Sequence, residues 1–381
     1  MPIIDQGYQH WSGELSGHAW RWLAVTRQGI KITMRNRFLR YVLFAAWVPA
    51  LALVTMLSAW GLLERKSSMV SAFIQFMRFM NPGVVADPRY YRVEIWRLSY
   101  GYFLHFELFF SMILILLVGP SLISQDLRVN ALPLYFSRPL RRFDYFLGKL
   151  GVIVAFMGMV LIVPAVVAYI FGLLFSLDIS VIPDTFGILL EVVAYGLMIA
   201  LSAGTLILAL SALSRNSRYV ALMWLGLWFV SSVVGSVLEG VHHQQMRYAA
   251  FAGTQQFHGR HFHHEPHAAR TPQQWHQRMV AWQKSQAVYQ AAVLHDTQTD
   301  WRPLVSYIGD LSRIEDHLLG LNSAWRKLAK LEPSITARNR LLARYTGPQF
   351  PWYWSVAVLV FLFGLSLCIL NLSIRSLDRL K

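Results

Sequence analysis

The sequence has 381 residues, of which 55% are hydrophobic and only 14% are charged. A soluble domain of this length needs more charged surface, so a protein that crosses a membrane several times is the better prediction. The net charge of +15 would suit a nucleic-acid-binding protein, yet the basic residues are spread between apolar runs and form no recognition motif. We therefore expect no nucleic-acid partner, and we assign these residues to membrane topology.

Residues 1–40 precede the first long apolar run and contain no recognisable cleavable signal sequence. Between Trp20 and Arg37, apolar and basic residues recur at roughly helical spacing. This pattern predicts a helix lying in the membrane interface, with Lys and Arg facing anionic lipids as partners. The helix would anchor the chain in its orientation, and a second, compatible role is contact with a partner protein.

Six segments are long and apolar enough to cross a membrane as helices, which takes about 20 residues. They cover residues 41–63, 101–123, 150–177, 185–214, 219–238 and 351–374. The runs are continuously apolar rather than alternating, which favours helices over the strands of a barrel. The sequence thus predicts an all-α, polytopic membrane protein with six transmembrane helices.

The distribution of basic residues predicts which side each loop faces. An even number of spans places both termini on one side of the membrane. Sixteen of the 35 Lys and Arg residues lie in the short segments 1–40, 124–149, 214–218 and 375–381. Because short cytoplasmic segments are enriched in Lys and Arg, we expect these segments and both termini to be cytoplasmic. We expect the protein to lie in the cell (inner, cytoplasmic) membrane.

The chain then divides into four parts: the N-terminal segment 1–40, the first five spans within 41–240, an extracytoplasmic segment 241–350, and the last span with a short tail, 351–381. A small helix is expected before Asn81 in the shorter external loop. In the longer loop, cap and proline signals predict helices over residues 271–294, 312–331 and 335–344. We therefore expect a helical extracytoplasmic subdomain between the fifth and sixth spans.

Most of the thirteen histidines fall between His242 and His317. They are densest at His258, His261, His263, His264 and His267. Imidazole is a good ligand for Zn, Cu or Ni, but the spacing matches no fixed site, and Gly259 and Pro266 break any helix that would gather these side chains. We favour a polar loop that binds metal only opportunistically, and we assign no metal site.

Two acidic residues, Glu107 and Glu191, lie within the second and fourth spans. Carboxylates inside a membrane are costly, so each is a candidate for a polar substrate path. The alternative is a position near the external interface, where a carboxylate reaches water or a partner. We favour the interfacial position for Glu107 and leave both interpretations open for Glu191.

A polar, basic segment at 121–149 separates the second and third apolar runs. It includes the stretches Leu134-Tyr-Phe-Ser-Arg-Pro-Leu-Arg-Arg142 and Asp144-Tyr-Phe-Leu-Gly-Lys149. Pro133 and Pro139 restrict the backbone, and the arginines present charge to a protein or to lipid headgroups. The segment would be an ordinary positive loop, or a stiff bracket that passes a partner's movement to two helices. We favour the bracket, and we call residues 121–149 the elbow.

The order of small, acidic, basic and aromatic residues in the elbow resembles the corresponding loop of permease subunits of ABC-2 type exporters. The resemblance extends over the whole span layout, and a weaker one is found at residues 8–47, where the interfacial helix matches the family's connecting helix. Transferred to this sequence, it implies an elbow that couples to an ATPase through Asp126, Arg128, Leu134, Tyr135, Ser137, Arg138, Pro139, Tyr145, Gly148 and Lys149.

The resemblance also implies a function. The chain would be a permease that moves an unidentified substrate by alternating access, paired with a second permease chain, identical or related. The sequence contains no phosphate-binding loop, dinucleotide fingerprint, zinc-protease motif or nucleophile elbow. We therefore expect no enzymatic activity and no cofactor in this chain, with ATP and Mg bound by a separate ATPase subunit.

Two other interpretations stay open. One is a membrane-anchored scaffold or receptor that presents residues 239–350 to an extracellular partner. The other is a metal-handling membrane protein that uses the histidine-rich loop. Neither accounts for the order of residues in the elbow.

Overall fold

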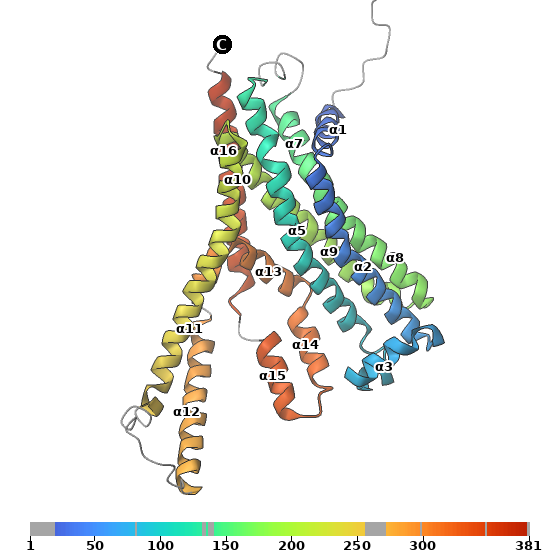
Figure 1. Ribbon diagram of the computed structural model, residues 1–381, viewed down its shortest axis with the longest axis vertical. Helices are drawn as coiled ribbons and strands as arrows, with labels where there is room; N and C mark the ends of the chain where they lie inside the picture. The colour runs from blue at the N-terminus through green and yellow to red at the C-terminus, as the bar shows by residue number, and fades with distance from the viewer. Residues whose placement is uncertain are drawn as a thin grey trace, which may run out of the picture.

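The computed structural model describes residues 20–80, 82–131, 135, 141–255, 272–297, 299–346 and 349–378. Within these ranges the chain forms helices and no strand. Most of the long helices run side by side in one bundle (Figure 1). One end of the bundle carries the two helix ends that flank the elbow, and we call it the elbow end. The opposite end carries α3, α12, α14 and α15, and we call it the loop end.

Six helical stretches are long and apolar enough to span a membrane. They are α2 (Arg37–Glu64), α5 (Arg92–Arg128), α7 with η3 and α8 (Arg142–Met157, Gly158–Ile162, Val163–Ser176), α9 (Val181–Leu213), α10 with η4 and α11 (Ser217–Leu225, Gly226–Val230, Ser231–Gln255), and α16 (Trp352–Asp378). The prediction of an all-α protein with six transmembrane helices is confirmed.

The spans α5 and α9 are the most buried and form the centre of the bundle. α2 packs against α8 and α5, and α16 packs against α9. Glycines allow the closest approaches: a Cβ on Gly61 of α2 would lie 2.7 Å from the backbone nitrogen of Ser176, and one on Gly172 of α8 would lie 2.7 Å from the Trp96 ring. Small residues at such contacts are typical of helix packing in membranes, where dispersion contacts replace the hydrophobic effect.

A buried ionic cluster joins three spans at the loop end. Arg92, the first residue of α5, is 2% exposed, and its guanidinium donates to both carboxylate oxygens of Glu64 at 2.9 and 2.7 Å. Arg92 also donates to Asp184 at 2.9 Å and to Asp178 at 3.3 Å, and Trp60 donates to Glu64. Breaking such a buried pair costs about 3–5 kcal/mol, so this cluster fixes the ends of α2, α5 and α9 together.

A second polar anchor joins α5 to α9 near the elbow end. Pro120 interrupts the backbone hydrogen bonds of α5, because proline has no N–H. In the turn that follows Pro120, the Ser211 hydroxyl of α9 accepts from the backbone N–H groups of Ile123 and Ser124 at 3.1 and 2.9 Å, and it donates to the Pro120 carbonyl at 2.9 Å. A serine thus enters the hydrogen-bond ladder of a neighbouring span, one turn before Asp126.

Shorter helices follow the first and the fifth spans. They are η2 (Ser68–Val70), α3 (Ser71–Met80), α4 (Pro82–Ala86), α12 (Pro272–Asp296), η5 (Arg302–Val305), α13 (Tyr307–Leu318), α14 (Leu321–Ala329) and α15 (Ile335–Tyr345). The expected helices before Asn81, from residue 272 and from residue 335 are present. The single helix expected over 312–331 is wrong: it starts earlier, with Ser306 as its cap, and Gly320 at φ 59° divides it into α13 and α14.

α13 packs against α5, α9 and α16 and so lies inside the bundle; the extracytoplasmic position expected for 241–350 stays a prediction. The Tyr307 hydroxyl is 3.3 Å from that of Ser202, and its ring packs on Trp224. Ser202 lies about 17 Å along α9 from its elbow end, at 1.5 Å per residue. α13 therefore begins among the spans, beside the half of α9 that is nearer the elbow end. A helix that does not cross the membrane is tolerated at this depth where protein surrounds it, and Tyr307 is 4% exposed.

Candidate functional site

The candidate site lies where α5 ends and α7 begins, on the two sides of the elbow. α5 ends at Arg128, and Asn130 follows in the left-handed conformation with φ 49°, which asparagine tolerates better than most residues. The backbone then turns back, since the N–H of Ala131 donates to the carbonyl of Asp126 at 2.9 Å. α7 begins at Arg142, and the Asp144 carboxylate accepts from the backbone N–H of Arg141 at 3.2 Å, a cap at the helix start.

Asp126 joins these two helix ends. Its Oδ2 atom lies 2.6 Å from the Lys149 ammonium and accepts from the Tyr145 hydroxyl at 2.7 Å. The Lys149 ammonium also lies 5.4 Å from the centre of the Tyr145 ring, within range of a cation–π attraction. Tyr145 is fully buried, and the side chains of Asp126 and Lys149 are only 15% and 11% exposed. The cluster is therefore shielded from water, and salt screens its attraction less than that of a surface ion pair.

Tyr135 extends this cluster into the elbow itself. Its ring centre lies 5.4 Å from that of Tyr145, and burial, with a smaller contribution from Asp126, raises the pKa of the Tyr135 hydroxyl. The phenol therefore stays neutral over the physiological pH range. This residue links the described part of the elbow to the base formed by α5 and α7.

α1 (Arg21–Thr33) lies across the first turns of α7. The Thr26 hydroxyl donates to the Gly148 carbonyl at 2.9 Å. A Cβ on Gly148 would lie 2.6 Å from Val25, and one on Gly151 would lie 2.5 Å from the Thr26 hydroxyl. Two glycines one turn apart thus form the surface on which α1 rests. A helix is present where the sequence predicted one between Trp20 and Arg37, and it contacts the start of α7 on the second flank of the elbow; its interfacial position stays a prediction.

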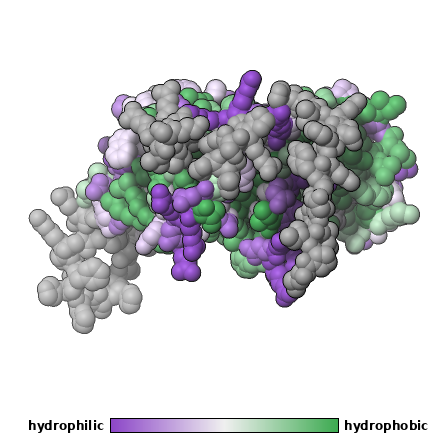
Figure 2. Space-filling view, turned by 90° about the horizontal axis from the view of Figure 1, so that it is seen from above, coloured by the Kyte–Doolittle hydropathy of each residue, from purple (hydrophilic) through white to green (hydrophobic). Residues whose placement is uncertain are grey.

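The structure brings together five of the ten predicted coupling residues: Asp126, Tyr135, Tyr145, Gly148 and Lys149. Arg128 is exposed at the last position of α5. Leu134, Ser137, Arg138 and Pro139 lie outside the described residues. Seen from the elbow end, hydrophilic side chains gather among the helix ends, while hydrophobic side chains cover much of one flank (Figure 2).

Chemically, this arrangement holds a loop on a stiff base. Three interactions meet at the start of α7: the ionic contact to α5, the aromatic contact to Tyr135, and the glycine contact to α1. A force applied to the elbow would therefore move α1, α5 and α7 together, as rigid-body switching requires.

The two carboxylates predicted for a substrate path lie in different surroundings. Glu107 is 0% exposed, because residue 107 lies on a face of α5 that packs inside the bundle. Its carboxylate therefore does not reach water, and its depth in the membrane stays a prediction. Neither of its carboxylate oxygens has a hydrogen-bond partner among the described residues. Glu191 is partly exposed and lies 4.0 Å from Arg97 of α5. Of the two carboxylates, only that of Glu107 is fully buried inside the helix bundle.

α13 adds two buried acids that sequence analysis did not select. Asp310 is 0% exposed and accepts from the Ser355 hydroxyl of α16 at 2.7 Å, and burial raises the pKa of Asp310 to about 7. Glu315 accepts from the Tyr195 hydroxyl at 3.3 Å, and burial also raises the pKa of Glu315. A continuous amphipathic pattern over 307–318 was the available signal, but it does not distinguish a helix outside the bundle from one inserted into it.

Comparison with known proteins assigns the chain to a family of membrane transporters. The family model described as ABC-2 family transporter protein matches residues 33–379, which is nearly the whole chain. No curated protein matches the chain. The match includes all six spans, the elbow and the helices between the fifth and sixth spans. The chain therefore belongs to the ABC-2 family of transporter proteins and is a multi-pass membrane component of that family.

Proposed function

We propose that the chain is the permease subunit of an ABC exporter and that its elbow receives the movement of a separate ATPase subunit, which binds ATP and Mg. The observation that carries the proposal is the shielded cluster of Asp126, Tyr145 and Lys149 at the base of the elbow. An ordinary connecting loop needs no buried ion pair between its two flanking helices. A loop that transmits force needs such a pair, because flanking helices that were free to shift would not pass the movement of the ATPase on to the spans.

In this proposal the elbow end faces the cytoplasm and both termini lie there. The short segments at that end carry a large share of the basic residues, in agreement with the positive-inside rule. A second permease chain, identical or related, would complete the path. The interior carboxylate of Glu107 would face the substrate during alternating access, and lipids would cover the outward faces of α2, α11 and α16.

The test is a charge reversal at the elbow in the assembled complex. Arg138→Glu is expected to insert and purify as wild type, because no span is altered, and to lose ATPase association or the stimulation of ATP hydrolysis. Truncating one partner of a desolvated charge pair across an interface costs about 2–5 kcal/mol. The matched control is Arg218→Glu, an exposed basic residue at the same end of the bundle.

The measurement is ATP hydrolysis by the complex co-purified with its ATPase subunit. The proposal requires that Arg138→Glu lowers the stimulated rate while Arg218→Glu does not. Unchanged binding and turnover in Arg138→Glu would leave the elbow as a loop that only connects two spans. Equal loss in both variants would point to the net charge of this end rather than to the elbow.

A further inference from the structure

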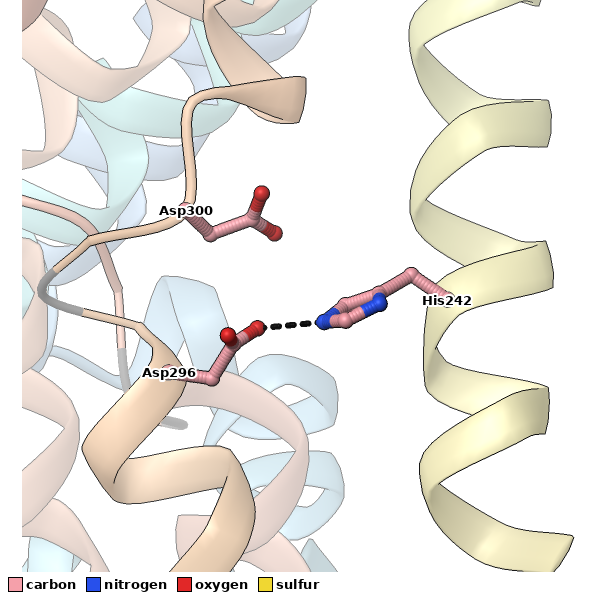
Figure 3. A group of neighbouring side chains, drawn as sticks. All are labelled: His242, Asp296 and Asp300. Carbon is pink, nitrogen blue, oxygen red and sulfur yellow. Dashed lines mark hydrogen bonds and ion pairs between the residues drawn. The ribbon is translucent and has the colours of Figure 1, made fainter.

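Three potential metal ligands converge at the loop end, between α11 and the end of α12. His242 projects from α11, Asp296 is the last residue of α12, and Asp300 follows in the next turn (Figure 3). One ligand atom from each residue lies within 4.8 Å of the other two. The His242 Nε2 atom is 2.6 Å from Asp296 Oδ2. A local backbone hydrogen bond, from the N–H of Asp300 to the carbonyl of Asp296 at 2.9 Å, keeps the two aspartates on one side.

We propose that His242, Asp296 and Asp300 form a binding site for one first-row divalent cation, with Zn²⁺ as the preferred ion. Zinc bonds to imidazole nitrogen and carboxylate oxygen are about 2.0–2.2 Å long. Three donors already within 4.8 Å of one another need only small side-chain movements to surround such an ion. A mixed set of one imidazole and two carboxylates suits zinc better than Mg²⁺ or Ca²⁺, which take oxygen ligands almost exclusively.

The charges around the site favour a cation. Asp296 and Asp300 bring two carboxylates together, and their side chains are only 30% and 7% exposed. Arg302 neutralises one of them, since its backbone N–H and its Nη1 donate to Asp300 Oδ1 at 3.0 and 2.9 Å. The second oxygen of Asp300 is not used in these bonds. Glu239, three residues before His242 on α11, lies on the neighbouring turn and pairs with His243 at 3.7 Å.

The competing explanation is a network of ion pairs without metal, in which a protonated His242 and Arg302 neutralise the two aspartates. The two explanations differ in what Arg302 does. In the network Arg302 is a necessary partner of Asp300. In a metal site its positive charge opposes the ion, so its removal is expected to strengthen metal binding.

A bound ion would have a structural consequence for the loop end. α11 and α12 pack against each other as an antiparallel pair, and the proposed ligands come from both sides of that pair. The ion would therefore join α11 to the turn that leads into η5 and α13. Because an ion that binds only the folded state stabilises it, zinc is expected to raise the melting temperature of this region. The inference does not depend on the proposed transport function.

The experiment uses the full-length chain in lipid nanodiscs, stripped with chelator and dialysed against Zn²⁺. The histidines at 258, 261, 263, 264 and 267 are first replaced together by Gln, which removes the histidine-rich loop as a competing binder. About one Zn²⁺ per chain is expected to remain after dialysis, measured by elemental mass spectrometry. His242→Gln and Asp300→Asn are each expected to weaken binding by about tenfold or more, since changes even one shell further out weaken metal sites 10–100-fold.

Two further variants make the result specific. His295→Gln, which removes the imidazole next to Asp296, is the matched control and is expected to leave binding unchanged. Arg302→Met is expected to increase zinc affinity. Size-exclusion profiles and helical content identify any variant that fails to fold. For such a variant, the visible absorption of bound Co²⁺ in the Asp296→Asn protein replaces the affinity measurement. Absence of bound zinc in the five-histidine background, or zinc retained equally by His242→Gln and Asp300→Asn, would overturn the proposal.

Discussion

Asp126 is the residue on which the base of the elbow depends. Its carboxylate has two partners from α7, and all three side chains are largely withdrawn from water. In such surroundings the pair itself adds little net stability, because both charges lose hydration. Removal of one partner is different, since it leaves a buried charge uncompensated. We therefore expect a single substitution in the cluster to lower the free energy of unfolding more than a double substitution that removes both charges.

We expect Lys149→Met to lower the free energy of unfolding by about 2–4 kcal/mol, because it leaves Asp126 buried without its counter-ion. Asp126→Asn combined with Lys149→Met is expected to recover most of this loss, since no charge then remains. The measurement is a denaturation midpoint for the wild type, both single variants and the double variant. Additive costs in the double variant would show that the two side chains are not coupled.

The buried carboxyl of Asp310 leads us to predict that the free energy of unfolding depends on pH. Its ordinary pKa is near 4, and burial raises the pKa to about 7 in the folded protein. The folded state therefore holds a proton that the unfolded state releases between these values. Stability contributed by the protonated carboxyl is fully present at acidic pH and is lost as the pH rises towards 7. The slope is up to about 1.4 kcal/mol per pH unit for one proton.

The groups around Asp310 define the control. Ser355 of α16 donates to it, Tyr307 lies one turn before it on α13, and Glu315 and Asp316 follow on the same helix. Burial also raises the pKa values of Glu315 and Asp316, so Asp310→Asn should flatten the pH profile without removing it. Asp87→Asn, an exposed acid at the same end, should leave the profile unchanged. If the free energy of unfolding of Asp310→Asn kept the wild-type dependence on pH, the proton that causes the slope would belong to a neighbouring group.

At the scale of helices, the contact between α1 and α7 depends most directly on the small size of two residues. Gly148 and Gly151 provide a surface without side chains, and Thr26 adds a hydrogen bond to the Gly148 carbonyl. A larger residue at Gly148 would collide with α1, since the Val25 side chain lies 2.6 Å and the Trp22 carbonyl 3.0 Å from a Cβ at that position. The position of α1 on the elbow thus depends on two glycines.

Gly148→Leu is expected to separate α1 from α7 while leaving the six spans folded. Hydrogen exchange at the backbone amides of residues 21–33 should speed up, because exchange reports local opening, whereas protection of α5 and α9 should persist. Gly187→Leu is the matched control, since nothing lies within 4 Å of a Cβ at Gly187. Unchanged protection of α1 in Gly148→Leu would mean that membrane lipids rather than α7 hold this helix.

Sequence analysis predicted those helices whose signals lie close together in the sequence, and it missed features that depend on contacts between distant residues. Spans were predicted because a run of apolar residues is a local property, and the helix from residue 335 because Ser334 caps it locally. The start of α13 was predicted wrongly, since both Ser306 and Ser312 are acceptable helix caps. The choice between them is made by distant contacts, such as the one between Tyr307 and Ser202.

The same limit applies to the site. Sequence analysis selected Asp126, Tyr145 and Lys149 through the order of residues in the elbow, but not the bonds that join them. It missed Ser211 and the Arg92 cluster, whose partners lie 28–92 residues away. Pro120 and Glu64 were the only local hints, because a proline in a span needs a partner for its freed backbone and a carboxylate at a span's end needs a cation.

At the scale of the molecule, α5 connects the two ends of the bundle. It is fixed to α2 and α9 by Arg92 at the loop end, to α9 again by Ser211, and to α7 by Asp126 at the elbow end. A helix of 37 residues with anchors at both ends moves as a unit with its neighbours. Movement of the elbow would therefore reach the loop end through α5, where α14 rests: Lys327 of α14 pairs with Glu94 at 2.8 Å.

The orientation of this molecule in the membrane gives the last prediction. Single cysteines are introduced at Arg215, between α9 and α10 at the elbow end, and at Gln283, on α12 beyond the loop end, in a Cys368→Ser background. Both positions are exposed, and the native cysteine is exposed and would otherwise react. Because the elbow end has the short basic segments, an impermeant maleimide applied to intact cells should label Gln283→Cys only. In inverted membrane vesicles it should label Arg215→Cys only. Labelling of both positions from one side would contradict the arrangement of six spans, and the reverse pattern would place the elbow outside the cell, where no ATPase could reach it.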